Sequence, residues 1–133
     1  MPVYLDHAAT TPMRPEAIAA YTDAMAVVGN PSSIHSQGQQ ARRMLEEARE
    51  TVAATLGADP IEVVFTSGGT EAVNLAVKGM YWARVDGGRR PRILAPSGEH
   101  HATLDTVEWL ERAEGARPDW LPLGREGRIV VPE

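Results

Sequence analysis

The sequence predicts an α/β fold with a mostly parallel sheet and flanking helices. Short runs rich in β-branched and aromatic residues alternate with longer segments whose apolar residues recur at three- and four-residue steps. Two of the short runs lead through a turn of small or polar residues directly into a helical segment. Parallel strands are joined by crossover helices, so this alternation indicates the α/β class.

The predicted elements follow from local signals in chain order. Pro15 suits the first turn of the first helix, and Gly57 and Gly79 suit the ends of the second and third. The third helix is apolar over most of its circumference, so we expect it to be buried. Loop residues are expected at 86–91, and Pro132 resembles the start of a further helix. The predicted strands are 3–5, 63–65, 92–95, 118–123 and 128–131, and the predicted helices are 15–28, 39–56, 71–78 and 102–113.

Composition narrows the class of protein. The chain has 133 residues, 43% of them hydrophobic, which suits one globular domain with a core. A net charge of -5 argues against a nucleic acid or an anionic membrane as partner. No apolar run approaches the ~20 residues of a membrane span, and no signal sequence opens the chain, so we expect a cytoplasmic protein. The chain has no cysteine, which excludes disulfides and thiolate chemistry within it.

A candidate anion site lies where the strand predicted at 63–65 meets the helix predicted from Glu71. The intervening turn, Thr66-Ser67-Gly68-Gly69-Thr70, is built of small residues. The first amides of a helix lack intrahelical partners, and the helix dipole favours negative charge there. Ser67 and Thr70 add hydroxyl donors, so we expect a phosphate at Gly69 and Thr70. The residues alone equally allow a capped helix without a ligand, in which Thr70 is the N-cap.

A second strand-to-helix turn contains Glu99, His100 and His101. Ligands of parallel sheets gather at the carboxyl ends of the strands, so His100 could share a crevice with the anion site. There it could stack on a planar ligand or move protons, although a hydrogen-bonded turn histidine is the simpler interpretation. Adjacent side chains point apart, so we expect no metal site at His100 and His101. Neither a Walker loop nor a dinucleotide fingerprint is present.

Four segments, in order, resemble the signatures of the cysteine desulfurases, which are pyridoxal-phosphate (PLP) enzymes of the class V aminotransferase family. The residues in these segments are most similar to those of the housekeeping and nitrogen-fixation type. The segments are Tyr4-Leu5-Asp6-His7-Ala8-Ala9-Thr10-Thr11-Pro12, Gly29-Asn30-Pro31-Ser32-Ser33-Ile34-His35 with Gly38, Phe65-Thr66-Ser67-Gly68-Gly69-Thr70-Glu71 with Asn74-Leu75-Ala76 and Lys78-Gly79, and Glu99-His100-His101-Ala102 with Leu104-Asp105.

The resemblance implies a fold and a set of site residues. Residues 1–133 would be part of a fold type I, aspartate aminotransferase-like PLP-dependent transferase domain. Residues 1–14 would pack near the small domain, and residues 15–133 would begin the large cofactor-binding domain. Gly69 and Thr70 would bind the cofactor phosphate, and His100 would stack on the pyridine ring and take part in proton transfer. His101 would be a neighbour of the site, as would Asn30, Ser33 and His35, to which no chemical role is assigned.

The resemblance also implies an activity. The whole enzyme would convert L-cysteine to L-alanine and an enzyme persulfide, supplying sulfur to an acceptor (scaffold) protein for iron–sulfur clusters or thio-cofactors, and would be a homodimer. The family attaches its cofactor to a lysine in a later segment. Lys78 lies about eight residues into a helix, roughly 12 Å from the phosphate end, and is expected to be a last-turn lysine that favours the helix dipole. Without that lysine and a catalytic cysteine, we expect this N-terminal portion to be inactive alone.

Three alternatives stay open. Another class V enzyme, such as a selenocysteine lyase or an aminotransferase, would share the phosphate turn. A stand-alone α/β module could hold a phosphate-bearing ligand without any chemistry. Finally, Lys78 itself could attach the cofactor covalently.

Overall fold

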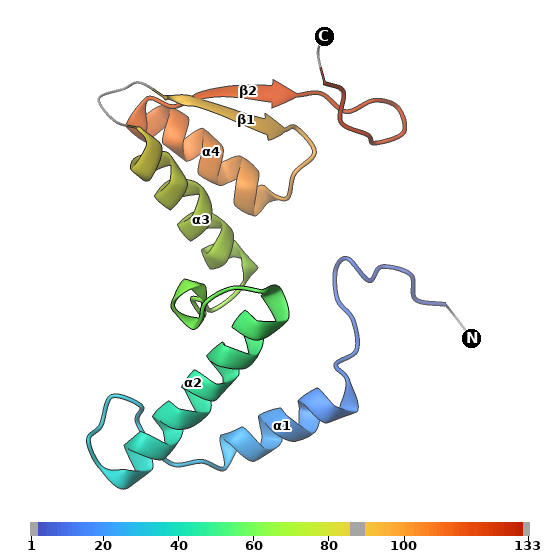
Figure 1. The fold of residues 1–133 in the computed structure, drawn as a ribbon. Helices are drawn as coiled ribbons and strands as arrows, with labels where there is room; N and C mark the ends of the chain where they lie inside the picture. The colour runs from blue at the N-terminus through green and yellow to red at the C-terminus, as the bar shows by residue number, and fades with distance from the viewer. Residues whose placement is uncertain (1–2, 86–89, 132–133) are drawn as a thin grey trace. The chain divides into compact units, whose positions relative to one another are not determined.

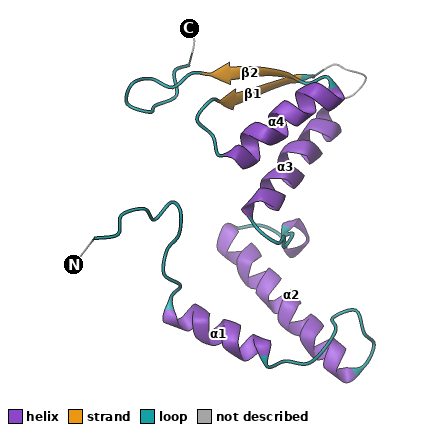
Figure 2. Ribbon diagram, turned by 180° about the vertical axis from the view of Figure 1, so that it is seen from behind, coloured by secondary structure: helices purple, strands orange, loops and turns teal. Residues whose placement is uncertain are grey.

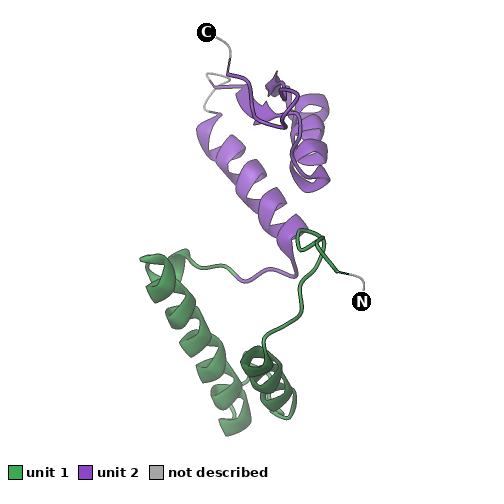
Figure 3. Ribbon diagram, turned by 90° about the vertical axis from the view of Figure 1, so that its right-hand side faces the viewer, with its two compact units in different colours: residues 1–64 green, residues 65–133 purple. Residues whose placement is uncertain are grey.

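The computed structural model describes residues 3–85 and 90–131, and the chain divides into two compact units (Figure 3). The first unit is Met1–Val64 and the second is Phe65–Glu133. The first is helical, whereas the second holds a parallel sheet with its helices, which confirms the predicted α/β class with a parallel sheet. The predicted loop at 86–91 falls partly outside the described residues, and the helix start predicted at Pro132 falls wholly outside them.

The first unit contains the helices α1 (Pro15–Met25) and α2 (Ser36–Leu56) and the short 3-10 helix η1 (Pro60–Glu62). Pro15 opens α1 as predicted, but the helix ends before the β-branched pair at 27–28 rather than after it. The predicted start of α2 was too late, because the Gln39 amide already donates to the His35 carbonyl at 2.9 Å. Gly57 ends α2 in the left-handed conformation, with φ of 66°, as predicted for this glycine.

Two strands predicted in the first half of the chain are wrong. Residues 3–5 form no strand, and neither does the segment 63–65, in which Val64 keeps 63% and Phe65 45% of its surface exposed. A strand requires a neighbouring ladder, and within the described residues only β1 and β2 provide one. The Val63 carbonyl instead accepts a hydrogen bond from the Arg49 guanidinium of α2. A β-branched run has the composition of a strand, but a strand forms only where a neighbouring strand pairs with it.

The second unit contains α3 (Gly69–Arg84), β1 (Arg92–Pro96), α4 (His101–Glu114) and β2 (Arg117–Leu121). The strands are parallel, with Arg92 opposite Arg117 and Pro96 opposite Leu121. Figures 1 and 2 show α3 and α4 side by side on one face of the two strands. The observed β2 begins one residue earlier and ends two residues earlier than the strand predicted at 118–123.

The core of the second unit lies between α3, α4 and β1. Leu110 is fully buried, and Tyr81 and Ala116 are almost so. The Tyr81 hydroxyl donates to the Glu114 carbonyl at 3.2 Å, so the buried ring keeps a hydrogen bond at its polar end. Partly buried apolar side chains complete this cluster, namely Val77, Val85 and Ile93.

The third predicted helix differs from α3 in length and in burial. The helix continues past Gly79 to Arg84, because Val77 and Tyr81 on either side of the glycine pack into the core and outweigh the ~1 kcal/mol cost of a helical glycine. Leu75 and Met80 are 54% and 62% exposed, so the expectation of burial all round is wrong. Only one stripe of this helix meets the core.

The carboxyl-terminal part of the described chain is a turn rather than a strand. Residues 124–127 form the predicted turn, with the Gly127 amide donating to the Gly124 carbonyl at 3.0 Å. The strand predicted at 128–131 is reduced to a single antiparallel bridge between Leu123 and Ile129. Among the helices that the structure describes, none is long and apolar enough to cross a membrane.

Candidate functional site

The helix α3 begins at the predicted anion turn. Its N-cap is Gly68 and not Thr70, and the first intrahelical hydrogen bond runs from the Ala72 amide to the Gly68 carbonyl at 3.1 Å. The amides of Gly69 and Thr70 precede that bond, so the helix leaves them as donors at its positive end. Open space surrounds the α-carbons of Gly68 and Gly69, where an added Cβ would meet no atom within 4 Å. The prediction that Thr70 would be the N-cap in a helix without a ligand is wrong in that detail, because Gly68 holds the N-cap position.

Ser67 does not add its hydroxyl to this set of donors. Both its amide and its hydroxyl donate to one carboxylate oxygen of Glu71, at 2.7 Å and 2.6 Å. The hydrogen bond from the Ser67 hydroxyl, followed by that from its amide, lowers the pKa of Glu71 below 4.5. These two hydrogen bonds therefore stabilise the turn internally. In the part of the chain that the structure describes, the Thr70 hydroxyl makes no such bond and stays free for a ligand.

His100 lies at the start of α4, after β1 and the turn 97–99, as the sequence predicts. It is the N-cap of α4, and its Nδ1 accepts a hydrogen bond from the Ala102 amide at 3.0 Å. The Ser97 amide donates to the Leu121 carbonyl at 2.9 Å, which ties the beginning of this turn to the end of β2. His100 therefore stands at the carboxyl end of a parallel strand, where ligands of such sheets gather.

Thr70 and His100 line one groove of about 330 Å³ between α3 and α4. The structure therefore brings together two of the three predicted site residues, while Gly69 lies beside Thr70 at the start of the helix and outside the lining. Five further lining residues went unpredicted as members of a site, although helical spacing along α3 and α4 is visible in the sequence. These are Asn74, Ala102, Asp105, Thr106 and Trp109.

Lys78 belongs to the same groove. Its Nζ lies 4.3 Å from the ring centroid of Trp109, which is a cation–π distance. The prediction that Lys78 occupies the last turn of its helix is wrong, because α3 continues to Arg84. Lys78 therefore does not serve the dipole of this helix; it joins α3 to α4 across the groove.

His101 has a different environment from His100. Its Nδ1 lies 3.7 Å from Oδ1 of Asp105, one turn further along α4. The two histidine rings are 6.5 Å apart with an interplanar angle of 72°. Throughout residues 3–85 and 90–131, no group of three histidine, aspartate or glutamate side chains is arranged to hold a metal ion.

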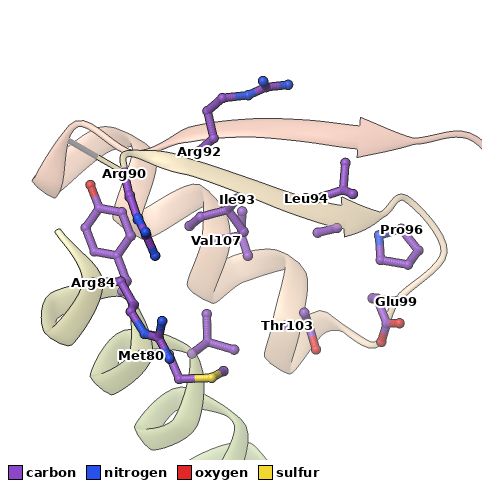
Figure 4. A pocket seen from close by; sticks show the side chains of 13 residues that line it. Met80, Arg84, Arg90, Arg92, Ile93, Leu94, Pro96, Glu99, Thr103 and Val107 are labelled. Atoms are coloured by element: carbon purple, nitrogen blue, oxygen red, sulfur yellow. The ribbon is translucent and has the colours of Figure 1, made fainter. Parts of the chain in front are cut away.

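A larger hollow of about 600 Å³ is lined by α3, β1 and α4 of the second unit, and Figure 4 shows its lining. Its floor is apolar, with Ile93 and Ala95 of β1 and Val107 of α4. Arg84 and Arg90 lie toward one end, and Glu99 and Thr103 toward the other (Figure 4). No residue predicted to bind or act on a ligand lines it, so the groove at Thr70 and His100 is the candidate site.

The motif with Asn30, Ser33 and His35 has a structural role in the first unit. Asn30 Oδ1 accepts from the Ser32 amide at 2.9 Å, and the Ser33 amide donates to the Asn30 carbonyl at 2.9 Å. Gly38 is buried against this loop, and a Cβ there would lie 2.5 Å from the Asn30 carbonyl oxygen. These residues fold the loop onto the start of α2, and His35 is the backbone N-cap of that helix.

Comparison with known proteins decides the family. The sequence model of the class-V aminotransferases matches residues 3–133. The chain belongs to the class-V aminotransferase family. Within this family it is 56% identical to the IscS-like cysteine desulfurase of Mycobacterium tuberculosis over 127 residues, which are 95% of this chain and 32% of that protein. It is 45% identical to the cysteine desulfurase IscS of Dictyoglomus turgidum, over 96% of this chain and 32% of that protein.

Solved structures carry a similar fold. A NifS-like protein matches with a TM-score of 0.76 and 34% identity, over 92% of this chain and 33% of its own. DndA from Streptomyces lividans matches with a TM-score of 0.71 and 37% identity, over 90% of this chain and 33% of its own. This class-V chain thus spans about a third of the length of the curated relatives it matches, each 32% covered.

Proposed function

We propose that this chain contributes the phosphate-binding turn and the ring-stacking histidine of a PLP-dependent cysteine desulfurase. The whole protein would convert L-cysteine to L-alanine and an enzyme persulfide, and would pass the sulfur to an acceptor protein. The observation that carries the proposal is the shared groove of Thr70 and His100, on a chain 56% identical to an IscS-like cysteine desulfurase. A cytoplasmic homodimer, as expected from the sequence, belongs to the same proposal.

The donor set at the start of α3, beside the groove, fits the phosphate of PLP. Among the residues that the structure describes, the amides of Gly69 and Thr70 and the Thr70 hydroxyl have no hydrogen-bond acceptor, and they lie at the positive end of α3, which suits a dianion. Gly68 and Gly69 have no Cβ, so a phosphate can approach the backbone there. Lys78 adds a positive charge further along the same groove.

The chain's own residues would bind and orient the cofactor. When bound, PLP supplies the electron sink that stabilises a carbanion at the substrate α-carbon. Gly69 and Thr70 would hold its phosphate, and the His100 ring would cover one face of its pyridine and keep water from that face. Neither a cysteine nor a second lysine is present in the 133 residues, so the persulfide and the covalent attachment of the cofactor would use residues outside them.

Binding of pyridoxamine 5'-phosphate to the chain tests this proposal. This form of the cofactor has no aldehyde, so reaction with stray amines does not confuse the result. We expect Thr70→Val to weaken binding roughly ten-fold or more, because a hydrogen bond to a charged group is worth about 1.5–3 kcal/mol. His100→Ala should also weaken binding, through lost stacking. Equilibrium dialysis and the 31P resonance of the ligand would measure both effects.

A matched control comes from the first unit. Thr51 is an exposed helical threonine whose hydroxyl donates to the Glu47 carbonyl at 2.8 Å, so Thr51→Val should leave binding unchanged. A parent chain that binds inorganic phosphate as tightly as pyridoxamine 5'-phosphate, with no effect of His100→Ala, would instead identify a stand-alone phosphate-binding module. Failure of Thr70→Val to weaken binding would remove the phosphate assignment.

Substrate choice separates the proposed desulfurase from other class-V enzymes. We expect the protein that contains this chain to release alanine from L-cysteine and to form a persulfide. Alanine released from L-selenocysteine alone would identify a selenocysteine lyase, and transfer of the amino group to a keto acid would identify an aminotransferase. Quantified alanine and persulfide from the same reaction decide among the three.

A further inference from the structure

We propose that Glu71 is a positioning residue of the phosphate-binding turn, whose carboxylate holds Ser67 so that the amides at the start of α3 are presented to the phosphate. Glu71 would act through Ser67 and would not touch the ligand. The inference rests on the proposed cofactor site, because it gives a further residue a role in that same site. The contact between Glu71 and Ser67 belongs to the turn itself and needs no ligand.

The contact reaches across the start of α3. Glu71 is the third residue of that helix, whereas Ser67 precedes the N-cap Gly68. The Ser67 amide and hydroxyl donate to the same Glu71 oxygen, Oε2, at 2.7 Å and 2.6 Å. Such short distances are typical of hydrogen bonds to an ionised carboxylate. The two bonds therefore close the turn around Gly68, Gly69 and Thr70.

The two glycines of the turn depend on such support. Gly68 and Gly69 have no side chain to pack, and open space surrounds their α-carbons. Glycine has more backbone freedom than any other residue, so an unsupported turn with two glycines loses much entropy when a ligand fixes it. A turn that is fixed before the ligand arrives avoids this cost and binds more tightly.

Hydrogen bonds fix the peptide planes on both sides of the turn. The Gly68 carbonyl accepts from the Ala72 amide at 3.1 Å. The Gly69 amide belongs to the same planar, trans peptide, so it points the opposite way, out of the start of the helix. The bonds to Glu71 fix the peptide that precedes Ser67. The backbone that leads into the Gly69 amide is therefore held at both of its ends.

Glu71 lies outside the ligand groove. Among the described residues that line the groove of Thr70 and His100, Glu71 is absent. A carboxylate that faced the phosphate would repel it, and the position of Glu71 on Ser67 limits this repulsion. The Ser67 hydroxyl, followed by the Ser67 amide, lowers the pKa of Glu71, so the acceptor of both bonds stays ionised.

The simpler interpretation is that Glu71 only favours the helix dipole, as acidic residues in a first turn do. The two interpretations differ for Glu71→Gln. Glutamine keeps a side-chain oxygen that can accept from both Ser67 donors, but it carries no charge. A positioning role therefore survives this substitution, whereas a dipole role is lost.

Hydrogen exchange at the Ser67 amide tests the contact on the chain without a ligand. Glu71→Ala removes the acceptor, and we expect exchange at Ser67 to accelerate by roughly five-fold or more, as for a lost capping bond. Glu71→Gln should exchange at a rate close to that of the parent. Glu71 is exposed, so neither substitution should unfold the chain. Equal exchange at Ser67 in Glu71→Ala and the parent would overturn the inference.

Binding of pyridoxamine 5'-phosphate, measured by equilibrium dialysis, tests the role in the site. We expect Glu71→Ala to lower the affinity by roughly five-fold or more, because the freed backbone must be fixed again on binding. Glu71→Gln should keep the parent affinity. Glu62→Ala is the matched control, because Glu62 accepts a bond of the same kind from the Asp59 amide, at 2.8 Å, in the first unit. It should bind like the parent.

The outcomes of the binding test separate this inference from the proposed function. A parent chain that does not bind the ligand would overturn both. A parent that binds, with Glu71→Ala binding equally well, would overturn this inference alone. Equal losses in Glu71→Ala and Glu71→Gln would assign Glu71 to the helix dipole and would also overturn it. A loss in Glu71→Ala that Glu71→Gln restores is the result expected of a positioning residue.

Discussion

The Nζ of Lys78 lies 4.3 Å from the centre of the Trp109 ring, and this contact joins α3 to α4. Both side chains line the groove that holds Thr70 and His100. The pair therefore adds a contact between the two helices that carry the candidate site. It also gives the chain's only lysine a structural role.

Breaking this contact should weaken the second unit. We expect a coupling of about 0.5–1 kcal/mol between Lys78→Met and Trp109→Leu, because the pair is partly exposed. Urea unfolding of the two single variants and the double variant measures the coupling. Lys78→Arg should retain most of it, since a guanidinium also binds an indole face. Strictly additive single effects would show that the contact contributes nothing to stability.

The covalent alternative for Lys78 can be tested directly. Because the ammonium is placed over Trp109 and two turns along the helix from Thr70, we expect one equivalent of PLP followed by borohydride to leave most of Lys78 unmodified. Peptide mapping by mass spectrometry locates the label. Stoichiometric modification of the Lys78 peptide, abolished by Thr70→Val, would instead make Lys78 the attachment site.

Ser67→Ala should raise the pKa of Glu71 toward 4.5. The parent value is lowered first by the Ser67 hydroxyl and then by its amide. A lowered folded-state pKa contributes stability that is present above pH 4.5 and is lost as the pH falls through the folded pKa. An NMR titration of the Glu71 side-chain carboxyl carbon measures the change. Ser36→Ala, which removes a hydroxyl bonded to Gln37, should leave the titration of Glu71 where it is.

Gly38→Ala should destabilise the first unit. The new Cβ would lie 2.5 Å from the Asn30 carbonyl oxygen and 2.7 Å from that of Ser33, so the loop backbone has to move. Overpacking of this kind costs about 1–3 kcal/mol. Gly79→Ala is the matched control, because its Cβ meets nothing within 4 Å and the change favours the helix by ~1 kcal/mol. Thermal unfolding of both variants should shift the midpoint in opposite directions.

Local signals predicted the helices well and the strands poorly. Pro15 and Gly57 marked a real helix start and a real helix end, because their effects act within one turn of the backbone. The strand predicted at 63–65 failed, since a strand depends on a partner that local sequence does not specify. Gly79 failed as a stop signal for a related reason. Its cost is smaller than the packing of Val77 and Tyr81, which only the assembled core provides.

In the candidate site, too, some features were predicted from local sequence and others depend on tertiary packing. The two strand-to-helix turns were visible in the sequence, and so were Thr70 and His100 as its polar residues. That both line one groove depends on α3 packing beside α4, which no pattern within either turn specifies. The Asn30 and Ser33 contacts within the loop likewise became interpretable only once Gly38 was seen to be buried against them.

The sequence by itself determined that this chain is an α/β protein with a small-residue anion turn and a histidine after a later strand. These properties depend on backbone preferences over a few residues, and they are therefore encoded locally. The tertiary structure decided that Ser67 bonds to Glu71 while the Thr70 hydroxyl has no partner among the described residues. It also decided that Lys78 lies over Trp109 and that His100 directs Nδ1 at Ala102. Each of these contacts depends on which donors and acceptors come together in space. The positions at which the helices begin, and the way in which they pack, determine this.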